Sequence, residues 1–143
     1  PLNAVFEYSK TAQEFMTKLC KAIKKDGGIA INFDYGYDQY DFANTLQAIK
    51  NHQKIDLFSA LANADITAHV DFLALDKIVR NFELESSLVA QEEFLLNLGA
   101  QERVDFLIQK NPHLAQEILT GFVKLIDKNQ MGKLFKSHIF WKK

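Results

Sequence analysis

The amino-acid sequence predicts an α/β fold in which the strands of one sheet alternate with helices. An amphipathic segment at residues 9–25 is followed by the Gly27-Gly28 pair and by an apolar run at residues 29–33. Helix, glycine turn and strand in that order form half of a βαβ unit. Residues 82–89 and 134–141 supply two further strand patterns, with helical patterns between them. Together these three strands indicate part of an α/β sheet.

The composition is typical of one globular domain with its own core. The chain has 143 residues, of which 48% are hydrophobic and 24% are charged, and its formal net charge is -1. This balance gives no electrostatic case for binding nucleic acid or an anionic membrane surface. No apolar run approaches the ~20 residues of a membrane-spanning helix. The single cysteine, Cys20, excludes an internal disulfide, and its place on an apolar helical stripe favours a packed core position.

Residues 9–25 predict an amphipathic helix because their apolar residues recur at the spacing of one helical face. Phe15, Leu19 and Ile23 follow one another at intervals of four. Ser9 stands where an N-cap residue would accept a hydrogen bond from the first turn. The glycine pair that follows the helix ends it and turns the chain into the first strand.

The strand predicted at residues 29–33 stops abruptly at an acid, an aromatic residue and a glycine, which are Asp34, Tyr35 and Gly36. In open α/β sheets, ligands bind beyond the carboxyl ends of the strands. We therefore expect Asp34 and Tyr35 to lie at a strand end and at a ligand site. The alternative is that Asp34 only forms a turn and caps local backbone.

Residues 36–64 show weak periodicity and are rich in aromatic and polar side chains. A loop this long inside a compact domain is either functional or a sign that its elements have been misassigned. We therefore expect a structured, lid-like loop in this region, with helical turns at about residues 46–50 and 57–61.

Residues 65–72 alternate strictly between polar and apolar side chains. If this segment is extended, its polar side chains share one face. They are Asp65, Thr67, His69 and Asp71. Asp71 is also suited to cap a helix that runs to about Asn81.

The rest of the chain predicts helices between two strands. The elements follow in the order strand 82–89, helix 91–98, helix 101–110, a helix opened by Asn111-Pro112, and strand 134–141. The helices at residues 91–127 read as an insertion before the last strand. We expect the whole chain, residues 1–143, to form a single domain.

Five short sequence motifs follow one another along the chain. They are Asp34-Tyr35-Gly36-Tyr37, Thr45-Leu46-Gln47-Ala48 with His52, residues 64–72, Gln91 with Phe94-Leu95, and Met131-Gly132 with Leu134-Phe135-Lys136. Together they resemble the C-terminal half of the MidA family, which includes mitochondrial protein arginine methyltransferases that assist assembly of respiratory complex I. The resemblance runs from about Glu7 to the end of the chain, and the motif around residues 65–72 is the most distinctive.

The order of elements also resembles the second half of a class I, Rossmann-like S-adenosylmethionine methyltransferase. In that fold a seventh strand, here residues 134–141, lies antiparallel between the fifth and sixth strands. The N-terminal half of the family carries a glycine-rich loop and an acid that holds the cofactor ribose, and no G-x-G-x-G occurs here. We therefore expect a fragment that lacks the cofactor-binding half and binds S-adenosylmethionine poorly on its own.

The resemblance implies an enzyme that uses S-adenosylmethionine to methylate an arginine side chain of a protein partner. It also implies a location in a bacterial-type cytoplasm or in the mitochondrial matrix. Ala90 and Glu92 stand beside Gln91 where the family usually has Thr and Gly, which puts any role for that turn in doubt. A fragment with an exposed sheet edge would also favour pairing between two copies of the chain.

Methyl transfer to a guanidinium needs a carboxylate that holds the cation and a group that accepts a proton. Asp34 is the first candidate carboxylate, followed by Asp65 and Asp71, although Asp71 could equally serve only as an N-cap. His69 is the candidate proton acceptor, or alternatively a structural hydrogen-bonding residue. The predicted catalytic residues are Asp34, His69 and Asp71, and the predicted substrate-binding residues are Tyr35, Gly36, Tyr37, Asp65 and Thr67.

Aromatic side chains near the first strand could surround a cationic substrate group by cation–π contact, or could simply pack on one another. They are Tyr35, Tyr37, Tyr40 and Phe42. His52 is a weaker candidate for the site. No spacing of His, Cys and Asp resembles a metal site.

Two other functions stay open at the level of the sequence. A non-catalytic interaction module or assembly factor would use the aromatic loop and the helical insertion as contact surfaces. A small-molecule hydrolase would use Asp34 and His69. It lacks an evident nucleophile, because no Gly-x-Ser-x-Gly occurs and no base pairs with Cys20.

Overall fold

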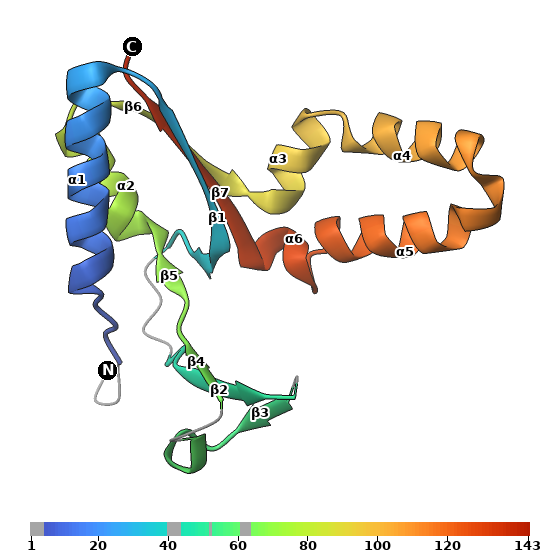
Figure 1. Cartoon of the computed structure of the whole chain (residues 1–143), viewed down its shortest axis with the longest axis horizontal. Helices are drawn as coiled ribbons and strands as arrows, with labels where there is room; N and C mark the ends of the chain where they lie inside the picture. Colours follow the sequence, from blue (N-terminus) through green and yellow to red (C-terminus); the bar gives the residue numbers. More distant parts are fainter. Residues whose placement is uncertain (1–4, 40–43, 52, 61–63) are drawn as a thin grey trace.

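The computed structural model describes residues 5–39, 44–51, 53–60 and 64–143 (Figure 1). The main sheet has four strands, which lie in the order β5 (Val70–Asp71), β1 (Ile29–Tyr37), β7 (Phe135–Trp141) and β6 (Glu85–Ala90). A small sheet stands apart from it, with its strands in the order β3 (Gln53–Ile55), β2 (Gln47–Lys50) and β4 (Asp65–Thr67), and the helices that follow β6 extend to one side (Figure 1). The mixed α/β architecture predicted from the sequence is therefore confirmed.

Helix α1 (Lys10–Asp26) forms where the amphipathic pattern predicts it. The Ser9 side chain accepts a hydrogen bond from the Ala12 backbone N–H at 3.3 Å, which confirms the predicted N-cap. Gly27 follows the helix with φ of 80°, a backbone conformation that costs glycine little. The helix therefore ends at the glycine pair, and the chain turns there into the main sheet.

The strand β1 (Ile29–Tyr37) is longer than predicted. It pairs antiparallel with β7 (Phe135–Trp141) in a register that runs from Ile29↔Trp141 to Tyr35↔Phe135. The prediction that the strand stops at Asp34 is wrong, because the ladder with β7 continues to Tyr35 and the parallel strand β5 (Val70–Asp71) pairs with Gly36 and Tyr37.

The strand β6 (Glu85–Ala90) pairs antiparallel with the other edge of β7, so β7 lies between β1 and β6. This is the position expected for the seventh strand of a class I methyltransferase sheet. The sequence pattern placed the start of β6 three residues too early, at residue 82, because residues 82–84 alternate in the same way without joining the ladder.

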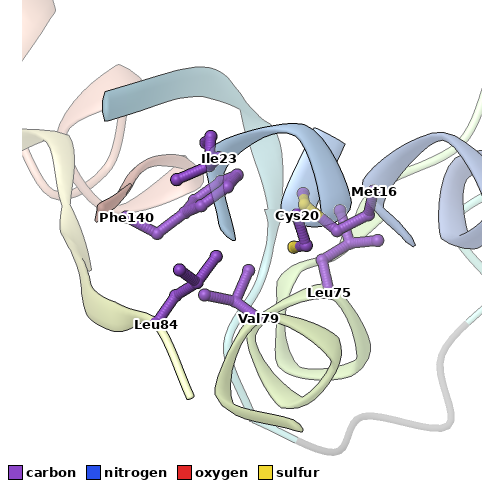
Figure 2. Close-up of a cluster of buried hydrophobic side chains, with 7 residues drawn as sticks. All are labelled: Met16, Cys20, Ile23, Leu75, Val79, Leu84 and Phe140. Carbon is purple, nitrogen blue, oxygen red and sulfur yellow. The ribbon is translucent and has the colours of Figure 1, made fainter. Parts of the chain in front are cut away.

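The core lies between the main sheet and the helices α1 and α2 (Phe72–Asn81). Figure 2 shows the side chains that meet there from α1, α2, the segment before β6, and β7. They are Met16, Cys20, Ile23, Leu75, Val79, Leu84 and Phe140. Cys20 is fully buried among them, which confirms that it is a packing residue, and burial raises the pKa of its thiol.

The region expected to be a lid-like loop folds into the small sheet. Its elements are β2 (Gln47–Lys50), β3 (Gln53–Ile55), the 3₁₀ helix η1 (Leu57–Ala60) and β4 (Asp65–Thr67). The helical turn predicted at residues 46–50 is wrong, because this segment pairs antiparallel with both β3 and β4. The turn predicted at about residues 57–61 is confirmed as η1.

The helices of the predicted insertion follow β6 in the chain and lead to β7. They are α3 (Gln91–Asn97), α4 (Ala100–Lys110), the 3₁₀ helix η2 (Pro112–Leu114), α5 (Ala115–Ile126) and α6 (Met131–Leu134). Asn111-Pro112 opens the 3₁₀ turn rather than α5 itself. Gln91 ties the first of these helices to a later one, because its Nε2 donates to the Leu125 carbonyl at 2.9 Å.

A buried polar cluster joins α2 to β6 and β7 beside the core. His138 is fully buried, and its Nε2 lies 3.3 Å from Asp76 Oδ1. Arg80 Nε donates to Asp76 Oδ2 at 2.6 Å, and the Ser86 hydroxyl donates to Asp76 Oδ1. Because His138 has no exposure to solvent, this Ser, His and Asp grouping supports the fold and is closed to substrates.

Burial, hydrogen bonds and neighbouring charges together set the charge states of this cluster. Burial lowers the pKa of His138, although the nearby Asp76 carboxylate opposes that shift. Burial also raises the pKa of Asp76, but the hydrogen bonds from Ser86 and Arg80 and the charge of Arg80 outweigh it and hold this pKa below its usual range. The folded protein therefore favours an ionised Asp76 beside a neutral His138.

The fold is expected to lose stability as the pH falls below about 6.5, the ordinary pKa of histidine. His138 then takes up a proton in the unfolded chain while the folded state resists the same protonation, so acid favours unfolding. For one proton the slope is no steeper than about 1.4 kcal/mol per pH unit. Urea unfolding at about pH 7.5, 6.5 and 5.5 measures it.

The variant His138→Gln should flatten this slope, whatever it does to the stability at neutral pH. The exposed His113 provides the matched control, and His113→Gln should keep the slope of the parent protein. An unchanged slope in His138→Gln would show that another group carries the pH dependence.

Candidate functional site

A pocket of about 250 Å³ opens where β1, β5 and the start of α2 meet the segment before α1. Its polar lining comes from three parts of the chain that are distant in sequence. The polar residues of the lining are Glu7, Tyr8, Ser9, Gln13, Tyr37, His69 and Asp71. Three of these, Tyr37, His69 and Asp71, are predicted site residues that the fold brings together at the carboxyl end of β1.

Gly36 allows this convergence because it lies where β5 crosses close to β1. A Cβ atom at this position would lie 2.2 Å from the Val70 carbonyl oxygen and 2.9 Å from the Phe72 ring. Only glycine permits the parallel pairing of Gly36 with Val70 and of Tyr37 with Asp71. The predicted substrate-binding residue Gly36 is buried, so its contribution is to shape the site.

Asp71 lies at the junction of β5 and α2 and faces the pocket. Its Oδ1 accepts a hydrogen bond from the Ala74 backbone N–H at 2.9 Å, which confirms the N-cap predicted from the sequence. The cap occupies one carboxylate oxygen, and Oδ2 is then the atom suited to meet a cation in the pocket.

His69 lies between β4 and β5 and contributes to the pocket wall. Its backbone N–H donates to the Thr45 hydroxyl oxygen at 2.8 Å. Its ring packs edge-on against Tyr35, with 5.6 Å between ring centroids, and Tyr35 in turn packs against Phe135 at 5.7 Å. Tyr35 therefore supports the histidine from the side and does not itself line the pocket.

The structure does not bring the other predicted carboxylates into this pocket. Asp34 is exposed, and its Oδ1 accepts a hydrogen bond from the neighbouring Tyr35 N–H at 2.8 Å, as in the alternative of a local cap. Asp65 and Thr67 belong to β4 in the small sheet, where they pair with β2. The predicted polar strip fails because the extended segment breaks at Ala68 and His69, so its two halves join different sheets.

Tyr40, Phe42 and His52, the remaining aromatic and histidine candidates, lie outside the residues that the structure describes. Tyr37 is the one member of the predicted aromatic group that lines the pocket in the described part of the chain. The aromatic side chains that could make the predicted cation–π contacts at the end of β1 are therefore Tyr37 and, from the N-terminal segment, Tyr8.

The sequence patterns missed Glu7 and Tyr8, which enter the pocket from the segment before α1. Glu7 makes three hydrogen bonds to Thr45 and Leu46 and is half-buried. Residues ahead of a helix carry no periodic signal, so pattern reasoning has nothing to detect there. The one available signal was the family resemblance, which begins at about Glu7.

An ion pair between a buried lysine and a half-buried aspartate fixes the chain just beyond Tyr37. Lys136 on β7 is buried, and its Nζ lies 3.2 Å from Asp38 Oδ1. Because Asp38 directly follows the last residue of β1, this pair holds the backbone where β1 meets the pocket. The carboxyl end of β1 is thus pinned by β5 on one side and by Lys136 on the other.

The described residues contain no glycine-rich loop between a strand and a helix. β5 runs directly into α2 with no glycine between them, and the glycines with positive φ lie at the end of α1 and at the start of α4. A nucleotide-type cradle needs a glycine-rich loop between a strand and a helix.

Within the described residues, no three His, Cys, Asp or Glu side chains are grouped as metal ligands. A search of that part of the chain also finds no helix with the length and apolarity to cross a bilayer.

Comparison of the sequence with known proteins gives several matches. A family model described as "Putative S-adenosyl-L-methionine-dependent methyltransferase" matches residues 2–89. The chain is 34% identical over 125 residues to the mitochondrial protein arginine methyltransferase NDUFAF7 of Rattus norvegicus, and 32% identical over 131 residues to that of Danio rerio. These matches cover 86% and 91% of this chain but only 28% and 31% of the two proteins. The chain thus spans less than a third of the length of these curated relatives.

Solved structures also resemble the fold. A Burkholderia thailandensis protein crystallised with S-adenosyl-homocysteine superposes with a TM-score of 0.81 at 25% identity, over 94% of this chain and 36% of that chain. An uncharacterised protein of the same organism gives a TM-score of 0.83 at 25% identity, over 94% and 38%. These likenesses confirm the predicted fold class.

Proposed function

Because the chain belongs to the family of S-adenosyl-L-methionine-dependent methyltransferases, we propose that it forms the substrate side of such an enzyme and that its pocket receives a protein arginine. Membership confirms the resemblance predicted from the sequence. The arginine substrate, by contrast, is our inference for this chain, and it agrees with the named activity of the relatives. The observation that carries the proposal is the pocket itself, in which Asp71, His69 and Tyr37 meet at the carboxyl end of β1.

The pocket has the chemistry that an arginine side chain requires. The Asp71 carboxylate can pair with a guanidinium, because guanidinium and carboxylate groups form strong, charge-assisted hydrogen bonds. The rings of Tyr8 and Tyr37 can pack against the flat face of the same group. Acidic and aromatic side chains around one small pocket favour a planar cation over an anionic or purely apolar ligand.

The proposed reaction also needs a proton acceptor. A methyl donor held by the whole protein supplies the methyl group. The guanidinium would gain a second positive charge on methylation unless one N–H proton leaves the nitrogen that gains the methyl, so the reaction needs a group that accepts this proton. His69 lines the pocket, and an imidazole nitrogen can accept a proton, so His69 is suited to receive that proton. Asp71 would orient the guanidinium, and Tyr35 would hold the His69 ring.

The open edge of β1 supports the proposal that this chain and the rest of a longer enzyme have separate roles. Beyond its two pairs with β5, the outer edge of β1 has no neighbouring strand among the described residues. The side chains of Ile29, Ile31 and Phe33 on one face of β1 are 62%, 52% and 48% exposed. We infer that further strands and helices of the enzyme, including the part that binds the cofactor, pack here, and that residues 91–127 are an insertion. This chain alone would bind the donor poorly.

Location and self-association are part of the same proposal. The arginine methyltransferase relatives named above are mitochondrial proteins, so the mitochondrial matrix fits an enzyme of this type. A bacterial-type cytoplasm fits the Burkholderia thailandensis proteins that share the fold. In the absence of the other strands, two copies of the chain could pair through the open edge of β1.

The variant Asp71→Asn tests the pocket directly. Asparagine caps a helix about as well as aspartate, so the start of α2 should stay intact while the negative charge is lost. We expect kcat/KM for arginine methylation to fall about tenfold to a hundredfold, the usual worth of a hydrogen bond to a charged group. The assay uses the whole enzyme that contains this chain, a methyl-labelled donor, and amino-acid analysis for methylarginine.

The variant Asp34→Asn separates the pocket from the first candidate of the sequence analysis. Asp34 faces solvent, so this variant should retain more activity than Asp71→Asn. The reverse order, with Asp34→Asn the more damaging change, would move the site away from the pocket and towards the exposed carboxylate.

The exposed apolar surfaces favour one other function, a non-catalytic interaction module. Leu98 and Phe106 on the helical extension are 70% and 47% exposed, in addition to the face of β1. Calorimetry with S-adenosylmethionine on the whole protein distinguishes the two functions. An enzyme binds the donor and turns it over, whereas a whole protein that shows no binding heat and forms no methylarginine would be an interaction module.

A further inference from the structure

One carboxylate links both ends of the segment that forms the small sheet. The chain enters β2 just after Thr45 and Leu46, and it returns to the main sheet at His69, just before β5. We refer to β2, β3 and β4 together as the arm. We propose that Glu7 is a clasp, a positioning residue that fixes both ends of the arm at the pocket and thereby places the backbone that carries His69.

The clasp is a continuous chain of hydrogen bonds. Glu7 Oε1 accepts from the backbone N–H of Thr45 at 2.8 Å and from that of Leu46 at 3.1 Å. The Thr45 hydroxyl donates to Glu7 Oε2. The oxygen of the same hydroxyl accepts from the His69 backbone N–H at 2.8 Å. Glu7 thus holds the entrance of the arm directly, and it holds the exit through Thr45.

The position of the arm depends on these bonds, because the described residues provide few other connections between the arm and the main sheet. No strand of the arm pairs with the main sheet in the described part of the chain, and the arm stands away from the core in Figure 1. Glu7 and Thr45 are 38 residues apart in sequence, so their contact is not a by-product of local chain geometry. Both residues are half-buried, which limits competition from water. Bonds to an ionised carboxylate are also roughly twice as strong as bonds between neutral groups.

The clasp has a consequence for the site. His69 and Glu7 both line the pocket, so the group that orders the arm also sets one wall of the cavity. A carboxylate offers about four acceptor positions, and the clasp uses three of them. The effect of Glu7 on methylation rests on the proposed function, whereas its effect on the arm does not.

Hydrogen–deuterium exchange on the full chain tests the clasp without any assay of activity. In Glu7→Ala, the amides of Thr45, Leu46 and His69 should exchange about tenfold to a hundredfold faster than in the parent, as expected for loss of hydrogen bonds to a charged group. The amides of α1 and β7 should keep their parent rates, because they belong to the core. Glu14→Gln is the control, since Glu14 is an exposed glutamate whose carboxylate lies 3.7 Å from the exposed Lys10 ammonium.

A second variant tests the relay through Thr45. Thr45→Val removes the hydroxyl but keeps both backbone N–H bonds to Glu7 Oε1. It should therefore speed exchange at His69 and leave Leu46 close to its parent rate. Parent rates at all three amides in Glu7→Ala would overturn the proposal. Equal acceleration in α1 and β7 would overturn it as well, because Glu7 would then support the fold as a whole.

Glu7→Gln connects the clasp to activity in the whole enzyme. Glutamine keeps an acceptor for the two backbone N–H groups and can donate its amide N–H to the Thr45 hydroxyl oxygen. It should restore most of the exchange protection that Glu7→Ala loses, and kcat/KM with it. If exchange shows the clasp but the whole protein forms no methylarginine, the proposed function fails and the clasp stands.

Discussion

Replacement of Gly36 with alanine is expected to destabilise the protein by about 3 kcal/mol and to dismantle the pocket. The added Cβ would lie 2.2 Å from the Val70 carbonyl oxygen, and a backbone atom in a paired strand cannot rotate out of the way. The strands β1 and β5 must therefore separate. Tyr37 and Asp71, which pair at the next position, would move apart with them. Urea unfolding measures the loss of stability, and calorimetry with an arginine peptide on the whole enzyme measures the loss of the site.

Gly121→Ala provides the matched control for this prediction. Gly121 lies inside α5, and nothing lies within 4 Å of the Cβ that alanine would add. Alanine favours a helix over glycine by about 0.5–1 kcal/mol, so this variant should be slightly more stable than the parent. If Gly36→Ala were as harmless as Gly121→Ala, the close approach of β5 to β1 would be wrong.

The variant Asp76→Ala is expected to cost about 3 kcal/mol, because it removes the acceptor at the centre of the buried polar cluster. Ser86 and His138 would each lose a partner inside the protein. Arg80 would lose its partner as well, but its side chain is 61% exposed and water can replace that bond. Thermal and urea unfolding measure the change.

The size of this effect should depend on burial and not on the loss of an acidic residue as such. Asp105→Ala, on the exposed side of α4, should change stability by no more than about 0.5 kcal/mol. Asp76→Asn should fall between the parent and Asp76→Ala, since the amide retains one acceptor oxygen for Ser86 and His138. Equal costs for Asp76→Ala and Asp105→Ala would mean that the cluster contributes nothing to stability.

The elements that the sequence predicts well are those whose signals are local. The boundaries of α1 follow from Ser9 and the glycine pair, and the start of α2 follows from the Asp71 cap. Burial of Cys20 follows from the apolar stripe. The antiparallel place of β7 between β1 and β6 came from the family resemblance, since strand order depends on contacts between distant segments that no local pattern contains.

The elements that the sequence predicts poorly are those fixed by distant partners. Residues 47–50 become a strand only because β3 and β4 pair with them, and Asp34 stays inside a strand because β7 pairs alongside it. Of the predicted site residues, the pocket contains Tyr37, His69 and Asp71, which lie where two segments converge. Glu7 could not be found by pattern, since its partners Thr45 and Leu46 are remote in the chain.

The register of β1 against β7 also sets the timing of folding during synthesis. Ile29 pairs with Trp141, so the first strand leaves the ribosome about a hundred residues before its partner exists. At typical translation rates, this delay lasts roughly 5 to 20 s. Throughout it, the apolar side chains of Ile29, Ile31 and Phe33 lack the neighbouring strand that aligns them. The helices between residues 91 and 126 can form from near neighbours in the meantime. The main sheet, however, cannot form until β7 has been synthesised, because β7 pairs with both β1 and β6. A nascent polypeptide of this kind therefore has particular need of a chaperone.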